Sequence, residues 1–313
     1  MTLLMFGAID GVVIGIADGR TSWFAKVSDT TVKALHYPSD ISGSAVAAAS
    51  VSAVLLVQGR ADFEIKGCRV LILDLIKEAL EGGGVEVFTS VMALGEWLWT
   101  NVLTTAVWHC PRCEEARQWL VDMHEGDLAD EEMVCPEHDA FSLVVAGCGG
   151  DDVTATPSVY LRTWASEQGP RLTPLADRLL KFWPAGPDVE VPSTVILANE
   201  LFDEGCGIRD AFEREAQKRN REHHKSIAED NEAEADKLRR DARLKLERLN
   251  SDSSLGTSER LHLAEAVEEE LQSDVSTMLG HTELSPIGGQ ALGVAVRADG
   301  SLLTSSTWRL EVE

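Results

Sequence analysis

Apolar residues near the start of the chain fall into two short runs that are separated by a turn. Residues 3–9 and 12–17 are almost wholly apolar, and Asp10 and Gly11 stand between them. An Asp-Gly pair between two apolar runs is a strong signal of a β-hairpin. The pattern therefore predicts that the chain opens with two antiparallel strands.

Among the later apolar segments, some have the spacing of a helix and others have that of a strand. Residues 44–59 are rich in alanine and favour a buried helix, and residues 71–80 and 85–103 predict two more helices, separated by the glycines at 82–84. Further strands are expected at residues 32–36, 141–146, 158–164, 291–296 and 308–312, and a loop at residues 184–192.

Residues 209–250 change the composition of the chain, because basic and acidic side chains are present in nearly equal number. This segment predicts one long helix, and residues 257–279 predict another. The charge pattern of this segment is typical of a solvated surface helix, and a paired coiled-coil arm is the alternative interpretation. Its narrow apolar seam consists of Ala235, Leu238, Ala242, Leu246 and Leu249.

Strand runs interrupted by helical runs favour an α+β fold of stacked layers over a regular parallel β/α alternation. With 313 residues, 44% of them hydrophobic, the chain is long enough to bury a substantial core. Its net charge of -24 argues against binding to nucleic acids or anionic membranes. No signal peptide or spanning segment stands out, and six cysteines are too few for a disulfide scaffold, so a cytoplasmic protein is expected.

Residues 109–139 are polar and acidic and contain three of the six cysteines. A C-x2-C pair followed by a C-x2-H pair is the ligand set and spacing of a structural zinc site, in which four ligands leave no position open for water. Such a metal would hold together an insert with too little apolar content to fold alone. The predicted ligands are Cys110, Cys113, Cys135 and His138, with His109 and His124 as alternative fourth ligands.

Thr2 follows the initial methionine directly. Methionine is normally removed before a residue as small as threonine, which would leave Thr2 with a free α-amine. Such an amine, with a pKa near 7.7 to 8.0, can act as the general base for the hydroxyl of the same residue. Met-Thr starts are common, so this pattern by itself indicates little.

The residues that follow Thr2 strengthen the case for a role of this threonine as a nucleophile. The stretch GAIDGVVIGIADGRTS, with Asp18 sixteen residues after Thr2 and Lys33 further on, resembles the opening of proteasome β subunits and their bacterial HslV-type relatives. FSLVVAGCGGDD with PSVYLR is similar to the central strand pair of that family. Ser285, followed by a Gly-Gly pair and ALGVAVRADGS, is similar to its C-terminal segment.

This resemblance implies a four-layer α-β-β-α fold of the N-terminal-nucleophile hydrolases, to which the zinc-knuckle insert and the long charged helical insert are added. It implies that Thr2 is the nucleophile, that Lys33 supplies a positive charge beside its oxygen, that Asp18 orients this lysine, and that Ser285 belongs to the same site. Lys33 comes one residue early for the family, and Lys26 is a weaker substitute.

The resulting division gives residues 1–108, 140–204 and 257–313 to the layered domain, 109–139 to the zinc insert and 205–256 to the long helix. The predicted function is a threonine peptidase that self-associates into a ring or another homo-oligomer, with an ATPase or another protein as a possible partner. The alternative is a catalytically inactive scaffold that binds a partner through the zinc insert and the helical arm. An amidase acting on a small substrate would share the chemistry but not the assembly.

Overall fold

The computed structural model describes residues 2–23, 26–38, 40, 51–58, 62–65, 68–82, 88–103, 142–149, 156–163, 170–184, 186–193, 201–251, 256–279, 285–299 and 301–310. The chain forms two compact units, one of Met1–Ala216 with Pro286–Glu313 and one of Gln217–Ser285. The first unit contains the β-sheets, and the second contains most of one long helix and the helix that follows it.

The first sheet is built around the predicted N-terminal hairpin. Strands β1 (Leu4–Ile9) and β2 (Val12–Ala17) pair antiparallel across Asp10 and Gly11, which have positive φ angles of 48° and 79°. Asp and Gly tolerate this left-handed turn, so the prediction from the sequence is confirmed. The sheet has the antiparallel order β13-β12-β1-β2-β14-β15, with β12 at Leu179–Trp183, β13 at Val189–Glu190, β14 at Gln290–Arg297 and β15 at Leu302–Arg309.

A second antiparallel sheet faces the first and has the order β11-β10-β9-β6-β5. Its strands are β5 (Ala34–Tyr37), β6 (Val51–Gln58), β9 (Ser142–Gly149), β10 (Ser158–Thr163) and β11 (Arg171–Pro174). Two separate hairpins complete the described strands, with β3 at Thr21–Trp23, β4 at Lys26–Ser28, β7 at Asp62–Ile65 and β8 at Cys68–Leu71.

Strand β6 corrects one prediction, since residues 44–59 were expected to form a buried helix. Residues 51–58 instead pair with β5 on one side and with β9 on the other. Every residue from Val51 to Val57 is buried, because the strand lies between two covered faces. A strand covered on both faces has no alternation of apolar and polar residues, so its pattern does not distinguish it from a helix.

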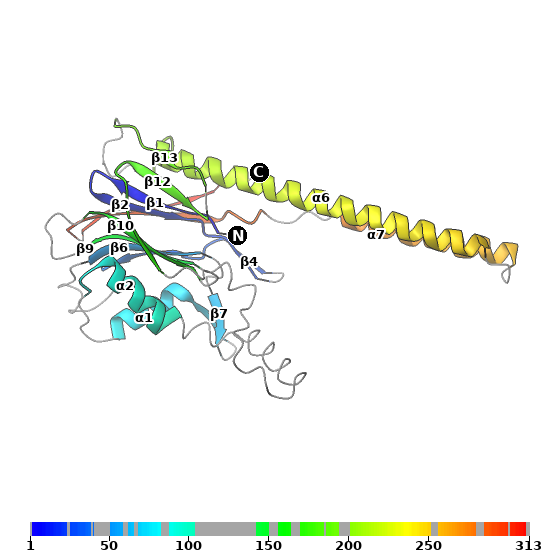
Figure 1. The fold of residues 1–313 in the computed structure, drawn as a ribbon, viewed down its shortest axis with the longest axis horizontal. Helices are drawn as coiled ribbons and strands as arrows, with labels where there is room; N and C mark the ends of the chain where they lie inside the picture. The colour runs from blue at the N-terminus through cyan, green and yellow to red at the C-terminus, as the bar shows by residue number, and fades with distance from the viewer. Residues whose placement is uncertain are drawn as a thin grey trace. The chain divides into compact units, whose positions relative to one another are not determined.

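The alternation of side chains along β1 assigns the two faces of its sheet. Leu4 and Phe6 belong to the apolar core between the sheets, whereas Leu3 and Met5 belong to the core on the outer face. Between the sheets, Val54 and other inward side chains of the second sheet meet those of the first. Figure 1 shows the two sheets stacked in this way.

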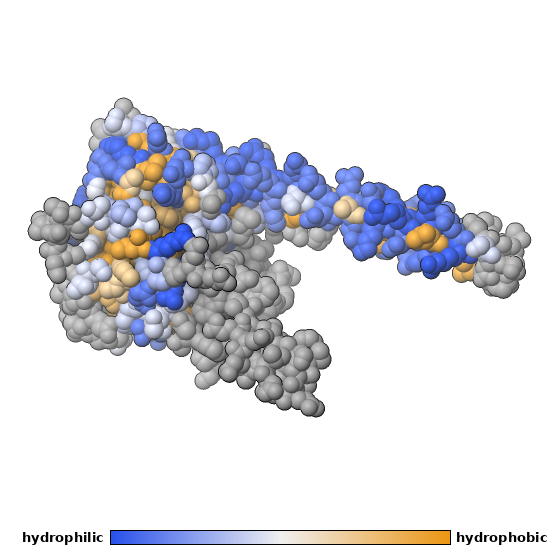
Figure 2. Space-filling view, in the orientation of Figure 1, coloured by the Kyte–Doolittle hydropathy of each residue, from blue (hydrophilic) through white to orange (hydrophobic). Residues whose placement is uncertain are grey.

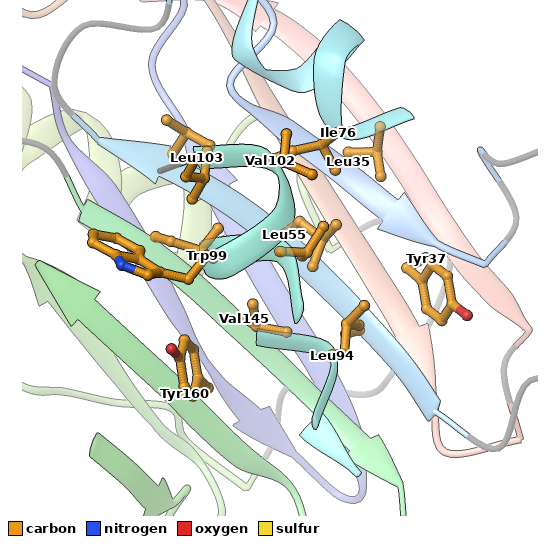
Figure 3. Close-up of a cluster of buried hydrophobic side chains, with 14 of the residues drawn as sticks. Leu35, Tyr37, Leu55, Ile76, Leu94, Trp99, Val102, Leu103, Val145 and Tyr160 are labelled. Atoms are coloured by element: carbon orange, nitrogen blue, oxygen red, sulfur yellow. The ribbon is translucent and has the colours of Figure 1, made fainter. Parts of the chain in front are cut away.

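Helices cover the outer face of the five-stranded sheet. Helix α1 (Ile72–Gly82), helix α2 (Val91–Leu98) and the π-helix η2 (Trp99–Leu103) pack on it. Figure 3 shows Leu94 of α2 and Trp99 of η2 over side chains of the sheet. Residues 85–103 were predicted as one helix, but α2 begins at Val91, where the Ser90 hydroxyl caps it by accepting from the Ala93 N–H (3.1 Å).

The first turns of helix α6 (Gly207–Ser251) cover the outer face of the six-stranded sheet. Ile208 and Phe212 of this helix share a core with Phe182 of β12 and Trp308 of β15. The α+β class and the two stacked antiparallel sheets are therefore confirmed. The predicted zinc insert, residues 109–139, lies outside the described residues.

The second unit consists of the rest of α6 and helix α7 (Thr257–Leu279). Ala235 and Ala242 of the predicted seam are buried, and Lys245 Nζ lies 4.0 Å from Glu270 Oε2 of α7. The long helix is therefore paired with a helix of its own chain. The face of this unit seen in Figure 2 is largely hydrophilic, and no helix among the described residues is long and apolar enough to span a membrane.

Candidate functional site

The N-terminal hairpin brings Thr2 and Asp18 together, because one residue precedes β1 and the other follows β2. Leu4 pairs with Ala17 at this end of the hairpin, and the Asp18 N–H donates to the Leu3 carbonyl at 3.2 Å. Residues that flank an antiparallel pair at the same end lie side by side. Leu3 and Asp18, fifteen positions apart in the sequence, are thus joined at the open end of the hairpin.

Backbone N–H groups fix the carboxylate of Asp18. Its Oδ1 accepts from the Leu3 N–H at 2.8 Å, and its Oδ2 accepts from the Arg20 N–H at 3.2 Å. The side chain is fully buried. These two backbone donors replace hydrogen bonds that the carboxylate would make to water.

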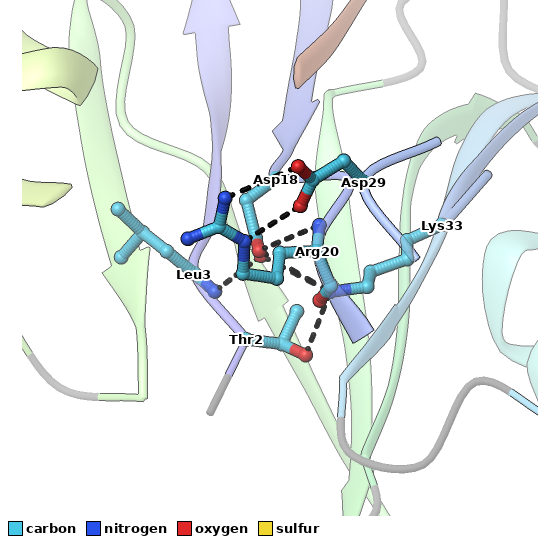
Figure 4. Close-up of polar contacts among 6 residues, drawn as sticks. All are labelled: Thr2, Leu3, Asp18, Arg20, Asp29 and Lys33. Carbon is cyan, nitrogen blue, oxygen red and sulfur yellow. Dashed lines mark hydrogen bonds and ion pairs between the residues drawn. The ribbon is translucent and has the colours of Figure 1, made fainter. Parts of the chain in front are cut away.

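Lys33 comes from the other sheet, since it directly precedes β5. Its ammonium donates to Thr2 Oγ1 at 3.1 Å, to the Arg20 carbonyl at 2.6 Å and to the Asp18 carboxylate, whose oxygens both lie at 3.3 Å. Figure 4 shows the lysine reaching these groups from one side. The structure therefore brings together three of the four residues that the sequence analysis assigned to the site.

Burial sets the chemistry of this group. The Lys33 and Asp18 side chains have no exposed surface, and Thr2 is also buried. A buried ion pair is tolerated when hydrogen bonds satisfy both partners, as they do here. A cation held 3.1 Å from a hydroxyl oxygen stabilises the negative charge that develops there when the hydroxyl loses its proton.

The sequence analysis missed the role of two residues beside this group. The Arg20 guanidinium donates to Asp29 through Nε (2.7 Å to Oδ1) and Nη2 (3.2 Å to Oδ2). This hydrogen bonding, above all, lowers the pKa of Asp29 from its usual range. The two residues are nine positions apart, with strands β3 and β4 between them, and no sequence pattern signals such a pair.

Ser285, the fourth predicted residue, lies at the end of the second unit. Its Oγ is 3.0 Å from Nε2 of His224 in α6. Thr2 belongs to the first unit, so the assignment of Ser285 to its site stays a prediction.

The four predicted zinc ligands, Cys110, Cys113, Cys135 and His138, lie outside the described residues. Within the described ranges, no group of three or more His, Cys, Asp or Glu side chains is placed to hold a metal ion. Cys148 and Cys206 are free cysteines. Burial raises the pKa of Cys148 to about 11, so this thiol stays protonated at neutral pH and is a poor nucleophile.

No protein-family model matches the sequence, and no curated protein matches it. Similar solved structures include a Gly-1 mutant of Anbu from Hyphomicrobium sp. strain MC1, which is 11% identical with a TM-score of 0.37 and covers 100% of this chain and 89% of that one. Anbu from the same strain is 12% identical with a TM-score of 0.37 and coverages of 99% and 88%. A helical assembly of the Anbu complex from Pseudomonas aeruginosa is 10% identical with a TM-score of 0.35 and coverages of 99% and 86%.

These structures correct one interpretation of the sequence. The chain was identified by resemblance with proteasome β subunits and HslV, but the similar solved structures are Anbu proteins, a distinct family. The motifs behind the resemblance are short and centre on one hairpin and one lysine, which is too little to separate related families.

Proposed function

We propose that this chain hydrolyses amide bonds of peptides with Thr2 as the nucleophile. The observation that supports this most is the contact of the Lys33 ammonium with Thr2 Oγ1 (3.1 Å), in a buried setting where Asp18 holds the lysine. A buried lysine needs acceptors, but a purely structural ion pair would not require a hydroxyl beside the ammonium. The arrangement fits a nucleophile beside a fixed positive charge.

The chemistry needs a base besides Lys33, because an ammonium that donates to Oγ1 cannot take its proton. Removal of Met1 would supply one in the α-amine of Thr2. Oγ1 would attack the substrate carbonyl carbon while the hydroxyl proton moves to this amine, directly or through water. The amine would then pass the proton to the leaving nitrogen, and water would hydrolyse the ester left on Thr2.

In these steps, Lys33 stays charged and stabilises the oxygen of Thr2. Asp18 balances the charge of the lysine, and its bonds to the Leu3 and Arg20 N–H groups keep the hairpin end closed. Neither side chain changes its protonation state. Their contribution is electrostatic, which is often the largest single part of catalysis.

The proposal extends to assembly and to the insert. We propose that the chain self-associates, as a ring or another homo-oligomer, and that residues 109–139 bind a structural Zn²⁺ through Cys110, Cys113, Cys135 and His138. An ATPase or another protein that acts with the oligomer would be a further partner. The name of the Pseudomonas structure describes a helical assembly of Anbu.

The test combines intact mass with covalent labelling. The purified protein is weighed by electrospray mass spectrometry and then treated with a β-lactone, which acylates activated hydroxyl groups. We expect a mass short by one methionine and an adduct that maps to Thr2. Thr2→Ser should retain labelling and Thr2→Ala should lose it.

Other outcomes would contradict the proposal. A retained Met1 without an adduct would favour the catalytically inactive scaffold. An adduct that persists in Thr2→Ala would place the reactive hydroxyl elsewhere.

A further inference from the structure

Arg20 contacts the site through its backbone, whereas its side chain is anchored away from it. Its N–H donates to Asp18 Oδ2 at 3.2 Å, and its carbonyl accepts from Lys33 Nζ at 2.6 Å. The latter distance is shorter than those from Nζ to Thr2 or to the Asp18 oxygens. The position of this one peptide segment therefore sets where the lysine ammonium can lie.

The side chain of Arg20 is held by Asp29 through two parallel hydrogen bonds (2.7 and 3.2 Å). Such a two-pronged pair fixes orientation as well as distance. The exposed fraction of the side chain is 15% for Arg20 and 41% for Asp29. The pair therefore lies at the boundary between the buried site and solvent. The lowered pKa of Asp29 keeps its carboxyl group charged as the pH falls.

The segment before β14 forms the other side of this arrangement. A Cβ atom on Gly288 would lie 2.8 Å from Cζ of Arg20, so a side chain at this position would displace the guanidinium. The Gly19 N–H donates to the Gly288 carbonyl at 3.2 Å, and the Gln290 N–H donates to the Asp29 carbonyl at 2.6 Å. The guanidinium is thus confined between Asp29 and a glycine.

We propose that Arg20 and Asp29 are a positioning pair for Thr2, which holds the Arg20 carbonyl on the Lys33 ammonium and so keeps that ammonium on the threonine oxygen. This inference rests on the proposed function of Thr2. It assigns a role in the reaction to an ion pair that touches neither the nucleophile nor a substrate. Loss of the pair lets the peptide of residue 20 shift, and the ammonium loses its closest acceptor.

Another two-pronged Arg-Asp pair of the first unit gives a matched control. Arg178 Nε donates to Asp10 Oδ1 at 3.1 Å, and its Nη2 donates to Asp10 Oδ2. The exposed fractions are 24% for Arg178 and 46% for Asp10, close to those of Arg20 and Asp29. This pair lies at the turn of the β1–β2 hairpin, at the end opposite Thr2 and Asp18.

The experiment measures the rate of acylation of Thr2 by the β-lactone, with intact mass as the readout, in the full-length protein. Asp29→Asn removes the charge at nearly constant shape, Gly288→Ala displaces the guanidinium from the other side, and Asp10→Asn is the control. We expect acylation to slow by up to about 100-fold in the first two variants, because a misplacement of about 1 Å can cost that much. Asp10→Asn should acylate at the wild-type rate, and Asp29→Glu should recover part of the loss.

The pH dependence separates positioning from a general loss of structure. An ammonium that has lost an acceptor gives up its proton more readily, so the alkaline limb of the acylation profile should move to lower pH in Asp29→Asn. In Asp10→Asn it should stay in place. A wild-type rate and an unchanged profile in Asp29→Asn would overturn the inference, as would equal slowing in Asp10→Asn. A wild-type protein that is never acylated at Thr2 would instead overturn the proposed function itself.

Discussion

The Lys33 ammonium and the Asp18 carboxylate form an ion pair with no exposed side-chain surface. Removing two charges from water costs several kcal/mol each, and their attraction offsets this only when hydrogen bonds satisfy the remaining donors and acceptors. Here the Leu3 and Arg20 N–H groups donate hydrogen bonds to the carboxylate. The Arg20 carbonyl and the Thr2 hydroxyl oxygen accept hydrogen bonds from the ammonium. The pair therefore links the stability of this region to its chemistry.

Lys33→Met should lower the free energy of unfolding by about 3–5 kcal/mol, because it leaves the buried Asp18 charge without its partner. Lys33→Met with Asp18→Asn removes both charges and should recover a good part of this loss. Both proteins should fail to acylate Thr2. Urea unfolding and β-lactone labelling measure the two effects separately, and a double variant less stable than Lys33→Met would contradict the account.

His36 of β5 is another buried polar residue of the first unit, but its ring lacks such hydrogen bonds within the described structure. Neither ring nitrogen has a hydrogen-bond partner among the described residues. Burial lowers the pKa of His36 below its usual 6.5, and the charge of Asp40 partly opposes this shift. The folded protein thus favours the neutral ring.

The pH dependence of stability follows from this direction. Below about pH 6.5 the unfolded chain binds a proton at His36 that the folded chain resists, so stability falls as the pH falls, by at most about 1.4 kcal/mol per pH unit from this residue. His36→Leu removes no hydrogen bond within the described structure and should make the decline between pH 7 and pH 5 shallower. Urea unfolding at both pH values tests it, and an equal decline in the variant would rule out His36 as a cause.

At the residue scale, the family resemblance implied Thr2, Asp18 and Lys33, and each of them flanks a short apolar strand of the structure. The ion pair of Arg20 and Asp29 was not predicted. Their contact depends on how the chain turns through β3 and β4 and on Gly288, which is more than 250 positions away in the sequence. The contact of Ser285 with His224 was not predicted for a similar reason, because the two residues are 61 positions apart and one of them lies within helix α6.

At the element scale, helix α2 lies close to the five-stranded sheet because it presents a glycine to it. A Cβ atom on Gly95 would collide with the Tyr160 ring of β10. Tyr160 is itself fully buried, and its hydroxyl donates to Glu96 Oε1 at 3.2 Å, next to this glycine. The helix and the strand are therefore closely fitted at one point.

Gly95→Ala should lower the free energy of unfolding by about 1–2 kcal/mol. Overpacking of a core costs about 1–3 kcal/mol, which exceeds the gain of up to about 1 kcal/mol when alanine replaces a helical glycine. Gly82→Ala, in α1, meets no atom within 4 Å and should be neutral or mildly stabilising. Thermal unfolding of both variants checks the difference. A stabilised Gly95→Ala variant would contradict the prediction and show that Tyr160 moves at little cost to make room for the methyl group.

Turn residues and charge patterns predicted the elements better than apolar content did. The hairpin of β1 and β2 was predicted because its turn residues are specific, and α6 and α7 because their charged faces are long. Strand β6 was predicted as a helix since it is buried on both sides and follows an alanine-rich run. Strand β13 was missed because only two of its residues pair.

At the scale of the whole molecule, the zinc insert is the largest prediction that the described residues leave open. The purified protein should contain about one zinc per chain, and Cys110→Ser or Cys135→Ser should abolish its binding. Cys206→Ser is the control, because this free cysteine lies outside the predicted ligand set. Elemental analysis after dialysis measures the metal, and zinc retained in both ligand variants would contradict the assignment.

The pairing of β14 with β2 has a consequence for when the surroundings of Thr2 are completed. During synthesis, Thr2, Asp18 and Lys33 leave the ribosome long before β14 does. Until residues 286–297 emerge, β2 lacks its neighbour, and Gly19 and Asp29 lack the Gly288 and Gln290 backbone groups that they contact. Contacts so distant in sequence form late. Under the proposed function, a nascent chain would thus carry Thr2 in an incomplete setting until β14 has been synthesised.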